Sequence, residues 1–148
     1  MIYILVALEP ELPVIPDSQD YKLVYTGVGK INAAMAATVA CMNPFCKRII
    51  NYGTAGALNP NIIDNLVNIG ILHQRDMDAR PLVELGYTPF ENDSGPITVS
   101  DSKYSLSTGD NFVTATPEIP TDAVDMEAYA IAKVCKKFNM PFECYKYM

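Results

Sequence analysis

The stretch DAVDMEAYAIAKVC, residues 122–135, places three carboxylates directly before an alanine-rich apolar run. The pattern predicts a helix over 123–138, and Asp122 or Asp125 is suited to cap its start and to favour its dipole. One capping residue is enough to begin a helix. The third carboxylate, Glu127, therefore has no role that the helix itself explains.

Apolar runs alternate with helical patterns along the rest of the chain. Met1–Ala7 is a continuous apolar run, which is typical of a strand buried on both faces, and we expect it to be a central strand. The remaining elements are predicted as strands at 21–27, 47–51, 65–72, 97–101, 104–110 and 141–148 and a helix at 28–42. This alternation indicates an α/β layer fold with a largely parallel sheet.

The composition fits one folded domain over residues 1–148. The chain is 49% hydrophobic and shows no repeat or linker. A net charge of −6, with 11 scattered Lys and Arg residues, argues against a nucleic-acid-binding surface, so a small ligand or another protein is the expected partner. The first apolar run is far shorter than the ~20 residues of a membrane span. We therefore expect no membrane association and a cytoplasmic location.

The chain contains four cysteines, Cys41, Cys46, Cys135 and Cys144. Their spacing matches neither a CxxC motif nor a histidine-containing cluster, so they are interpreted as buried free thiols of a reducing compartment rather than as disulfides or metal ligands. RDMD, with Asp76 and Asp78, has too few partners for a metal site and is expected to be a loop or a subunit contact. No metal and no other cofactor is therefore expected.

Four suggestive loops follow predicted strands: LEPEL at 8–12, TGVGK at 26–30, GTAGAL at 53–58 and STGDNFV at 107–113. In open α/β sheets, ligands bind beyond the carboxyl ends of the strands, where such loops gather. Their common position predicts a ligand site at that edge of the sheet.

Each of the first three loops also has a plainer interpretation. Glu9 and Glu11 flank Pro10, so at least one is placed to act as a base in a crevice, or both are surface carboxylates. TGVGK lacks the GxxxxGK[ST] spacing of a triphosphate site, which leaves a tight turn before a helix or a loop whose amides face a polar ligand. GTAGAL lets the backbone approach a flat ligand closely, and a plain tight turn uses the same residues.

Several single side chains have open assignments. Asp110 is suited to hold a ligand or to cap a turn, and Phe112 either stacks on a base or packs in the core. His73, the only histidine, has no Ser or Cys partner at a recognisable spacing, so a catalytic role is not favoured. Glu127 at the helix start is suited to accept hydrogen bonds from both hydroxyls of a vicinal diol. With Met126 beside it as an apolar wall, the pair suits a ribose.

Together, ALEPEL, TGVGKINAA, NYGTAGAL, STGDNFV and VDMEAYAIAKVC resemble the ordered motifs of the nucleoside phosphorylase/nucleosidase superfamily, most of all those of the 5′-methylthioadenosine/S-adenosylhomocysteine nucleosidases. The resemblance extends from near the first residue to the last. It implies a minimal version of a three-layer αβα fold with a mixed, largely parallel central sheet. It also implies hydrolysis of the N-ribosidic bond of a purine nucleoside, without a cofactor, by a homo-oligomer of two or more subunits.

The resemblance implies roles for particular positions. Glu11, the second acid of ALEPEL, would be the general base that activates water. Glu127 would accept hydrogen bonds from the ribose hydroxyls, and Phe112 would stack on the purine. The other substrate-binding residues that the resemblance implies are Leu8, Val28, Thr54, Ala55, Gly56, Val113 and Met126.

The chain also departs from the family pattern. PFECYKYM matches the strand before a Ser-Asp motif whose aspartate is associated with protonation of the purine, but the sequence ends at Met148. A weakly active or inactive relative, a different proton donor and a longer chain are the open alternatives. Phosphorolysis is another, although LEPEL, TGVGK and GTAGAL contain no arginine to hold phosphate. The remaining alternative is a protein that binds nucleosides or takes part in an assembly without catalysing a reaction.

Overall fold

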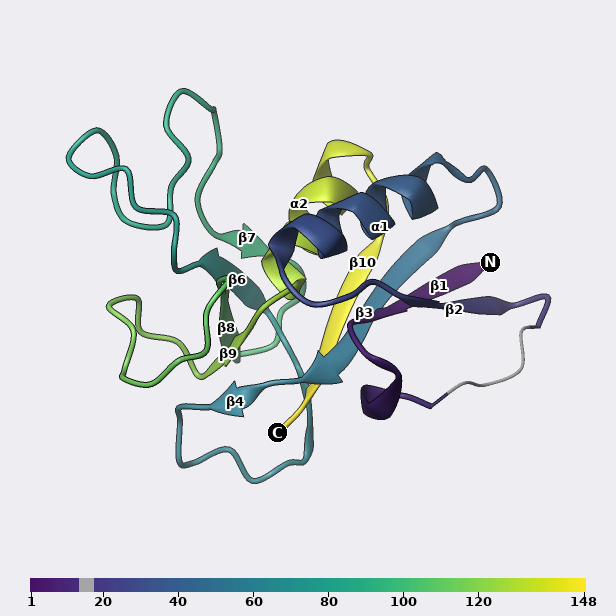
Figure 1. Ribbon diagram of the computed structural model, residues 1–148, viewed down its shortest axis with the longest axis horizontal. Helices are drawn as coiled ribbons and strands as arrows, with labels where there is room; N and C mark the ends of the chain where they lie inside the picture. Colours follow the sequence, from purple (N-terminus) through teal and green to yellow (C-terminus); the bar gives the residue numbers. More distant parts are fainter. Residues whose placement is uncertain (14–17) are drawn as a thin grey trace.

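The structure, a computed structural model, describes residues 1–13 and 18–148. Within these residues the strands form two five-stranded sheets, beside which two α-helices pack against each other (Figure 1). The strands are β1 (Ile2–Val6), β2 (Tyr21–Tyr25), β3 (Arg48–Thr54), β4 (Gly56–Ala57), β5 (Leu66–Asn68), β6 (Ile71–Gln74), β7 (Ile97–Thr98), β8 (Ser105–Thr108), β9 (Ala123–Asp125) and β10 (Phe142–Tyr147). The helices are α1 (Lys30–Met42) and α2 (Ala128–Lys137), and a 3-10 turn spans Glu9–Glu11.

The first sheet has the strand order β2-β1-β3-β10-β5. β1 pairs in parallel with β2 and β3, and β10 pairs in parallel with β3, whereas β5 is antiparallel at the edge. Leu5 and Val6 are fully buried, which confirms the prediction of a central strand at the start of the chain. Parallel pairing brings the carboxyl ends of β1, β2 and β3 to one edge of the sheet.

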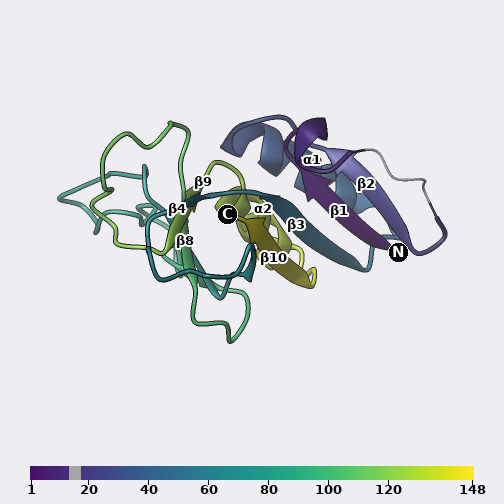
Figure 2. The same cartoon turned by 90° about the horizontal axis from the view of Figure 1, so that it is seen from below.

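The second sheet has the order β4-β9-β8-β6-β7 and lies to one side of the first sheet in both views (Figure 1, Figure 2). β8 is parallel to β6 and β9, and the edge strands β4 and β7 are antiparallel. β3 leads into β4 through Ala55, so GTAGAL connects the two sheets. Together the sheets and helices form the mixed, largely parallel α/β fold that the resemblance implies, with the strands in two sheets rather than in one central sheet.

Small side chains allow close packing of the helices. α1 buries Ala33, Ala37 and Ala40, which recur at helical intervals on one face. Ile131 and Cys135 of α2 belong to the same apolar cluster as these alanines. The alanine-rich pattern at 28–42 is thus confirmed as a helix that packs closely on its neighbours.

Three predicted elements differ clearly from the structure, and the shortest of them is the strand predicted at 97–101, of which only Ile97–Thr98 (β7) is formed. The predicted strand at 65–72 is two strands, β5 and β6, which belong to different sheets. The chain passes from one to the other at Gly70, where an added Cβ would lie 1.9 Å from the carbonyl oxygen of Ser102, so only glycine fits. The predicted helix at 123–138 begins later, because its first three residues form β9 beside β8.

Glu127 holds the N-cap position of α2, but Asp125 is the residue whose side chain binds the first amide of the helix. Its carboxylate accepts a hydrogen bond from the amide of Ala128 at 2.8 Å, in the first turn. Asp122 instead accepts hydrogen bonds from the amide of Ser105 and the side chain of Asn59, and so connects loops of the second sheet. Of the two residues predicted for the helix start, Asp125 is therefore confirmed.

The four cysteines are free thiols, as expected from their spacing. Cys46, Cys135 and Cys144 are buried, and burial raises the pKa of each of these thiols. None of the helices in residues 1–13 and 18–148 has the length and apolar character needed to traverse a bilayer.

Candidate functional site

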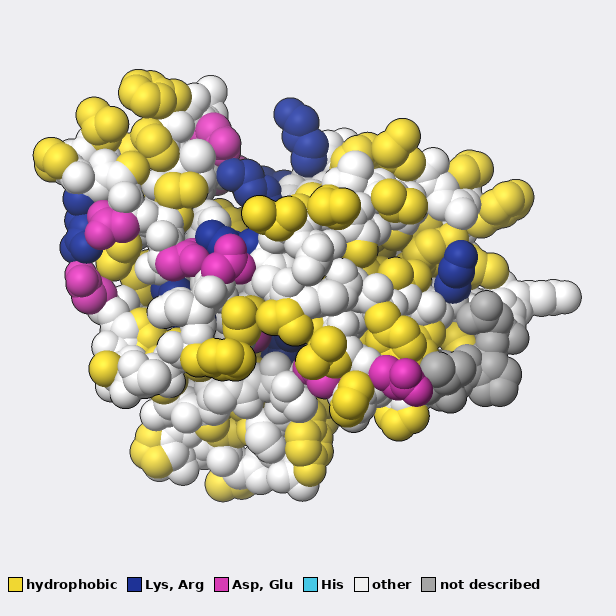
Figure 3. All heavy atoms as spheres, viewed as in Figure 1, with side chains coloured by type: hydrophobic (Ala, Val, Ile, Leu, Met, Phe, Trp, Pro, Cys, Tyr) yellow, Lys and Arg dark blue, Asp and Glu magenta, His cyan; other side chains and the backbone are white. Residues whose placement is uncertain are grey.

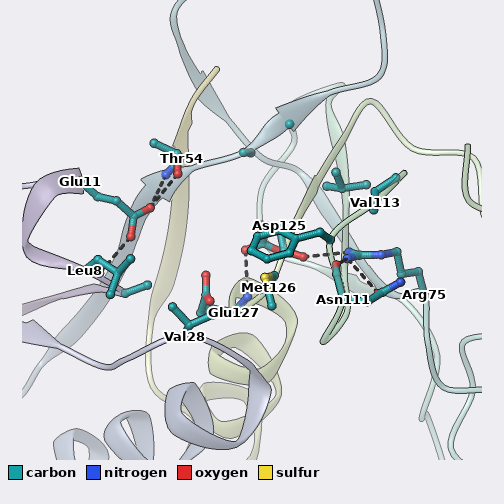
Figure 4. Close-up of a pocket in the computed structure, with 15 residues that line it drawn as sticks. Leu8, Glu11, Val28, Thr54, Arg75, Asn111, Val113, Asp125, Met126 and Glu127 are labelled. Atoms are coloured by element: carbon teal, nitrogen blue, oxygen red, sulfur yellow. Dashed lines mark hydrogen bonds between the residues drawn. The ribbon is translucent and has the colours of Figure 1, made fainter. Parts of the chain in front are cut away.

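A cavity of about 530 Å³ lies where the carboxyl ends of strands from both sheets meet (Figure 4). Its walls come from the segments that follow β1, β2, β3, β6 and β8 and from the end of β9, as the positions of the loop motifs predict. The ten residues to which the resemblance gives a role all lie in this set. The cavity is lined by Ala7, Leu8, Glu11, Val28, Thr54, Ala55, Gly56, Arg75, Asn111, Phe112, Val113, Val124, Asp125, Met126 and Glu127.

Glu11 is held in the cavity wall by three hydrogen bonds. Its Oε1 accepts from the amide of Leu8 at 3.0 Å, and its Oε2 accepts from the amide (2.7 Å) and the hydroxyl (2.9 Å) of Thr54. The hydroxyl of Tyr25 donates to the carbonyl of Leu12 at 2.7 Å and fastens the turn that carries Glu11. A carboxylate has about four lone-pair sites. Glu11 therefore keeps capacity for one further donor, such as a water molecule in the cavity.

A buried ammonium lies close to this carboxylate. Lys146 is 1% exposed, and its Nζ lies 3.0 Å from Oδ2 of Asp125. An added Cβ at Gly53 would lie 3.3 Å from this Nζ and 3.0 Å from Oε2 of Glu11. Burial opposes the charged form, but the charge of Asp125, its hydrogen bond to the ammonium and the charge of Glu127 act together with Cys144 to outweigh burial, so the pKa of Lys146 is raised. Lys146 is therefore a cation near both Asp125 and Glu11.

Glu127 lies immediately before α2 and is 7% exposed. Its Oε2 accepts a hydrogen bond from the amide of Gly29 at 2.9 Å, which fixes the orientation of the carboxylate. Burial raises the pKa of Glu127; the Gly29 hydrogen bond opposes this rise, and the charge of Asp125 adds to it. Figure 4 shows its carboxylate beside Val28 and Met126 at the floor of the cavity.

TGVGK bends directly before α1, which begins at Lys30. Gly27 and Gly29 have φ values of +85° and +97°, a region that favours glycine. Carboxylates of the same chain bind the amides at the helix start: the Gly29 amide donates to Glu127, and the Lys30 amide donates to Oδ1 of Asp110 at 2.8 Å. Val28 is the residue of this loop that lines the cavity.

Phe112 lines another wall of the cavity together with Asn111 and Val113. Its side chain is 85% exposed, so the alternative that it packs in the core is wrong. Arg75 lines the cavity beside these residues, and its guanidinium donates to the main-chain carbonyls of Asp125 and Asn111 (Figure 4). An exposed aromatic ring at the mouth of a cavity can pack against a flat ligand.

The remaining polar candidates do not line the cavity. Asp110 caps the start of α1, and Asp76 accepts hydrogen bonds from Nζ of Lys30 and from the amide of Asp110, each at 2.8 Å. His73 is half-buried in β6, and burial lowers its pKa. Glu9 is exposed and is not part of the cavity wall.

Lys146 and Arg75 were not identified from the sequence. A signal for Lys146 was present, because Cys144 and Lys146 share the buried face of β10 and a lysine is unusual there. Arg75 follows β6 in RDMD, a segment without periodicity, and its contacts lie far along the chain. No local pattern could have indicated them.

Comparison with known sequences relates the chain to one family. The family model described as "Phosphorylase superfamily" matches residues 18–71. A curated 5′-methylthioadenosine/S-adenosylhomocysteine nucleosidase of Staphylococcus haemolyticus is 31% identical over 152 residues, which cover 85% of this chain and 66% of that protein. The chain thus spans less than two thirds of the length of such curated relatives.

Solved structures share the fold. The 5′-methylthioadenosine/S-adenosylhomocysteine nucleosidase of Campylobacter jejuni superimposes with a TM-score of 0.85 at 22% identity, over 99% of this chain and 84% of that one. Futalosine hydrolase of Helicobacter pylori gives a TM-score of 0.84 at 22% identity, over 99% and 86% of the two chains. In sequence and in fold, this chain is related to the phosphorylase superfamily. Within that superfamily, its curated relatives are 5′-methylthioadenosine/S-adenosylhomocysteine nucleosidases.

Proposed function

We propose that the chain hydrolyses the N-ribosidic bond of a purine nucleoside of the methylthioadenosine or S-adenosylhomocysteine kind, giving the free base and the ribose derivative. What supports this most directly is one cavity in which two oriented carboxylates, Glu11 and Glu127, share the wall with an exposed aromatic ring, Phe112. The curated relatives bear the name of this activity. Because the chain spans only part of their length, its activity is proposed from its own site.

In this proposal the sugar binds at Glu127. One carboxylate oxygen is held by Gly29, and the other accepts hydrogen bonds from the ribose hydroxyls, with Met126 as the apolar wall. The purine stacks on Phe112 and contacts the backbone of Val113. The small residues of the wall after β3 (Thr54, Ala55 and Gly56) allow close approach of the ligand, and Leu8 and Val28 line the ribose and its 5′ substituent.

Glu11 is the proposed general base. Cleavage of an N-ribosidic bond passes through an oxocarbenium-like centre, which nearby carboxylates stabilise. The oxygen of a water molecule bonds to C1′ as the bond to the purine nitrogen breaks, and Glu11 takes the proton from that water. The three hydrogen bonds to Glu11 hold its carboxylate in the position from which it can accept this proton.

The leaving purine needs a proton of its own, and no cavity side chain is assigned to supply it. Among the described residues that line the cavity, Glu11 and Glu127 act on the sugar side, and Asp125 is paired with Lys146. A general acid contributes roughly 10²–10⁴-fold to a rate. Binding of a nucleoside with little or no turnover is therefore the second candidate function.

Hydrolysis is favoured over phosphorolysis by the start of α1. A helix N-terminus with free amides attracts phosphate. Here the amides of Gly29 and Lys30 already donate to the carboxylates of Glu127 and Asp110. These two negative charges would repel a phosphate ion at the start of α1.

The test is release of free purine from methylthioadenosine, adenosine, inosine and guanosine by the 148-residue chain, measured by chromatography with and without phosphate. Release that does not depend on phosphate is expected. Glu11→Gln should abolish it, whereas Glu9→Gln, an exposed neighbour on the same turn, should leave it unchanged. Release that requires phosphate would establish phosphorolysis. Binding of a nucleoside without any release would favour the second candidate.

We also propose that the chain forms a homo-oligomer. In support, α1 exposes large apolar side chains along one face, with Ile31, Met35 and Val39 at 74%, 63% and 71% exposure. Figure 3 shows hydrophobic side chains gathered over this helix. Such a surface is unusual in a monomer of this size. Light scattering at micromolar concentration checks this proposal, and a monomer would contradict it.

A further inference from the structure

Arg75 is a buried guanidinium that the proposed chemistry does not use. The residue is 9% exposed, and within the described residues its Nε–H has no hydrogen-bond partner. The acceptors of its other N–H groups in this part of the chain are main-chain carbonyls and an amide side chain rather than carboxylates. Burial of a cation without an ion-pair partner costs free energy. The hydrogen bonds that Arg75 makes should therefore explain why a charged side chain is buried here.

The guanidinium joins two segments of the cavity wall that come from different strands. Nη1 donates to the carbonyl of Asp125 at 2.8 Å, and Asp125 lies two residues before Glu127. Nη2 donates to the carbonyl of Asn111 at 2.8 Å, and Asn111 immediately precedes Phe112. One rigid group thus spans the segment proposed to bind the sugar and the segment proposed to bind the base.

Arg75 also contacts the end of β8, the stretch of chain just before Asn111. Nη1 donates to the carbonyl of Ser107 at 2.6 Å, and the amide of Arg75 donates to the carbonyl of Thr108 at 2.9 Å. Gly109 lies against the guanidinium, and an added Cβ there would lie 3.0 Å from Cζ of Arg75. Residues 107–109 can therefore shift only if the guanidinium shifts with them.

We propose that Arg75 is a positioning residue that sets the separation between Phe112 and Glu127. This inference rests on the proposed function, because the separation matters only if a base and its sugar bind together. The base and the ribose of a nucleoside lie at a nearly fixed distance, and catalysis requires both to be held within fractions of an ångström. The planar fork of arginine reaches both segments at once, whereas the single ammonium of lysine cannot.

Arg75→Lys in the 148-residue chain tests this role, because lysine keeps the positive charge but lacks the planar group that joins the two segments. Two probes separate the effects: adenine, which contacts the base wall alone, and a carbon-linked analogue of methylthioadenosine, which contacts both segments and cannot be hydrolysed. We expect the affinity for the analogue to fall by roughly tenfold or more, the size of one lost hydrogen bond to a charged group. The affinity for adenine should change far less. Arg48→Lys, at an exposed pair with Glu143, is the matched control and should change neither affinity.

A purely structural role predicts a different result, because loss of folded protein weakens both probes equally. Equal weakening, or no weakening of either, would overturn the inference. Hydrogen exchange of the free protein gives a measurement that needs no ligand: the amide of Gly109 donates to the carbonyl of Asp125 at 3.2 Å, the same carbonyl that Arg75 binds, and it should exchange roughly tenfold faster in Arg75→Lys because one hydrogen bond to a charged group is lost. If the wild-type chain binds neither probe, the proposed function fails and this inference fails with it. If exchange is unchanged while the wild type binds both probes, the inference alone fails.

Gly109→Ala provides a second variant in case Arg75→Lys does not fold. Its methyl group would press on the guanidinium at 3.0–3.1 Å without removing any of its donors. The expected result is a smaller loss of the same kind, greater for the analogue than for adenine. Equal effects on the two probes would overturn the inference here as well.

Discussion

Replacing Lys146 with methionine removes the ammonium of a buried ion pair and keeps most of the side-chain volume. In the wild-type chain, Nζ lies 3.0 Å from Oδ2 of Asp125, and both side chains are 1% exposed. Loss of one partner of such a pair costs about 3–5 kcal/mol, because the other charge stays buried. Asp125 keeps donors from the Thr108 hydroxyl and the Ala128 amide. We therefore expect the lower end of this range, about 3 kcal/mol.

Urea unfolding measures the free energy of unfolding, and thermal unfolding provides a second assay. A loss of 3 kcal/mol corresponds to a fall in Tm of roughly 6–12 °C for a domain of this size. Lys136→Met is the matched control, because it breaks a pair with Asp93 in which both side chains are largely exposed. The control should change stability little, since exposed pairs contribute little.

The double variant Lys146→Met/Asp125→Asn tests the physical reason. It removes both charges, so it should be more stable than the single variant. A single variant that lost less than about 1 kcal/mol, or a double variant as unstable as the single one, would refute the view that the lost stability comes from an unpaired Asp125. The pKa of Lys146 is raised in the folded chain. Its stabilisation is thus complete below the ordinary lysine pKa of about 10.4 and is lost as pH rises through the folded value.

Three further outcomes are expected. Phe112→Ala should leave Tm unchanged, because the residue is 85% exposed. It should weaken binding of the carbon-linked analogue, measured by calorimetry, by about 1–3 kcal/mol, the contribution of stacking a base on an aromatic ring. Gly53→Ala would bring a methyl group to 3.0 Å from Oε2 of Glu11, and purine release measured by chromatography should fall roughly a hundredfold; undiminished release would contradict the position assigned to Glu11. Burial raises the pKa of Glu127, so its carboxylate takes up a proton at a higher pH than an ordinary glutamate, whose pKa is about 4.3. Binding of the analogue, which needs the ionised carboxylate, should therefore weaken as pH falls before about pH 4.3 is reached. Glu127→Gln should remove this pH dependence.

The sequence predicts the elements that rest on local patterns. The apolar run at the start of the chain, the alanine-rich segment that became α1 and the apolar segment that became β10 are all found where they were expected. The ten residues implied by the resemblance all line one cavity, because the motifs follow parallel strands and those strands end at one edge.

The features that the sequence did not predict depend on contacts with distant parts of the chain. The strand predicted at 65–72 is divided at Gly70 because the backbone of Ser102 lies against it, a contact that no local pattern reveals. β9 precedes α2 because it pairs with β8, and the run of alanines that favours a helix begins only at Ala128. Arg75 is defined by carbonyls 32 to 50 residues away, so its own segment does not indicate its role.

The walls of the cavity are fastened by hydrogen bonds between residues that are far apart along the chain. The Lys30 amide and Asp110 are 80 positions apart, and the Gly29 amide and Glu127 are 98 apart. Contacts of such large sequence separation form slowly, since the entropy of closing a long loop is lost before they stabilise the chain. We expect the ability to bind a nucleoside to appear only in the last step of refolding. A fluorescent nucleoside analogue would then report the completion of the fold.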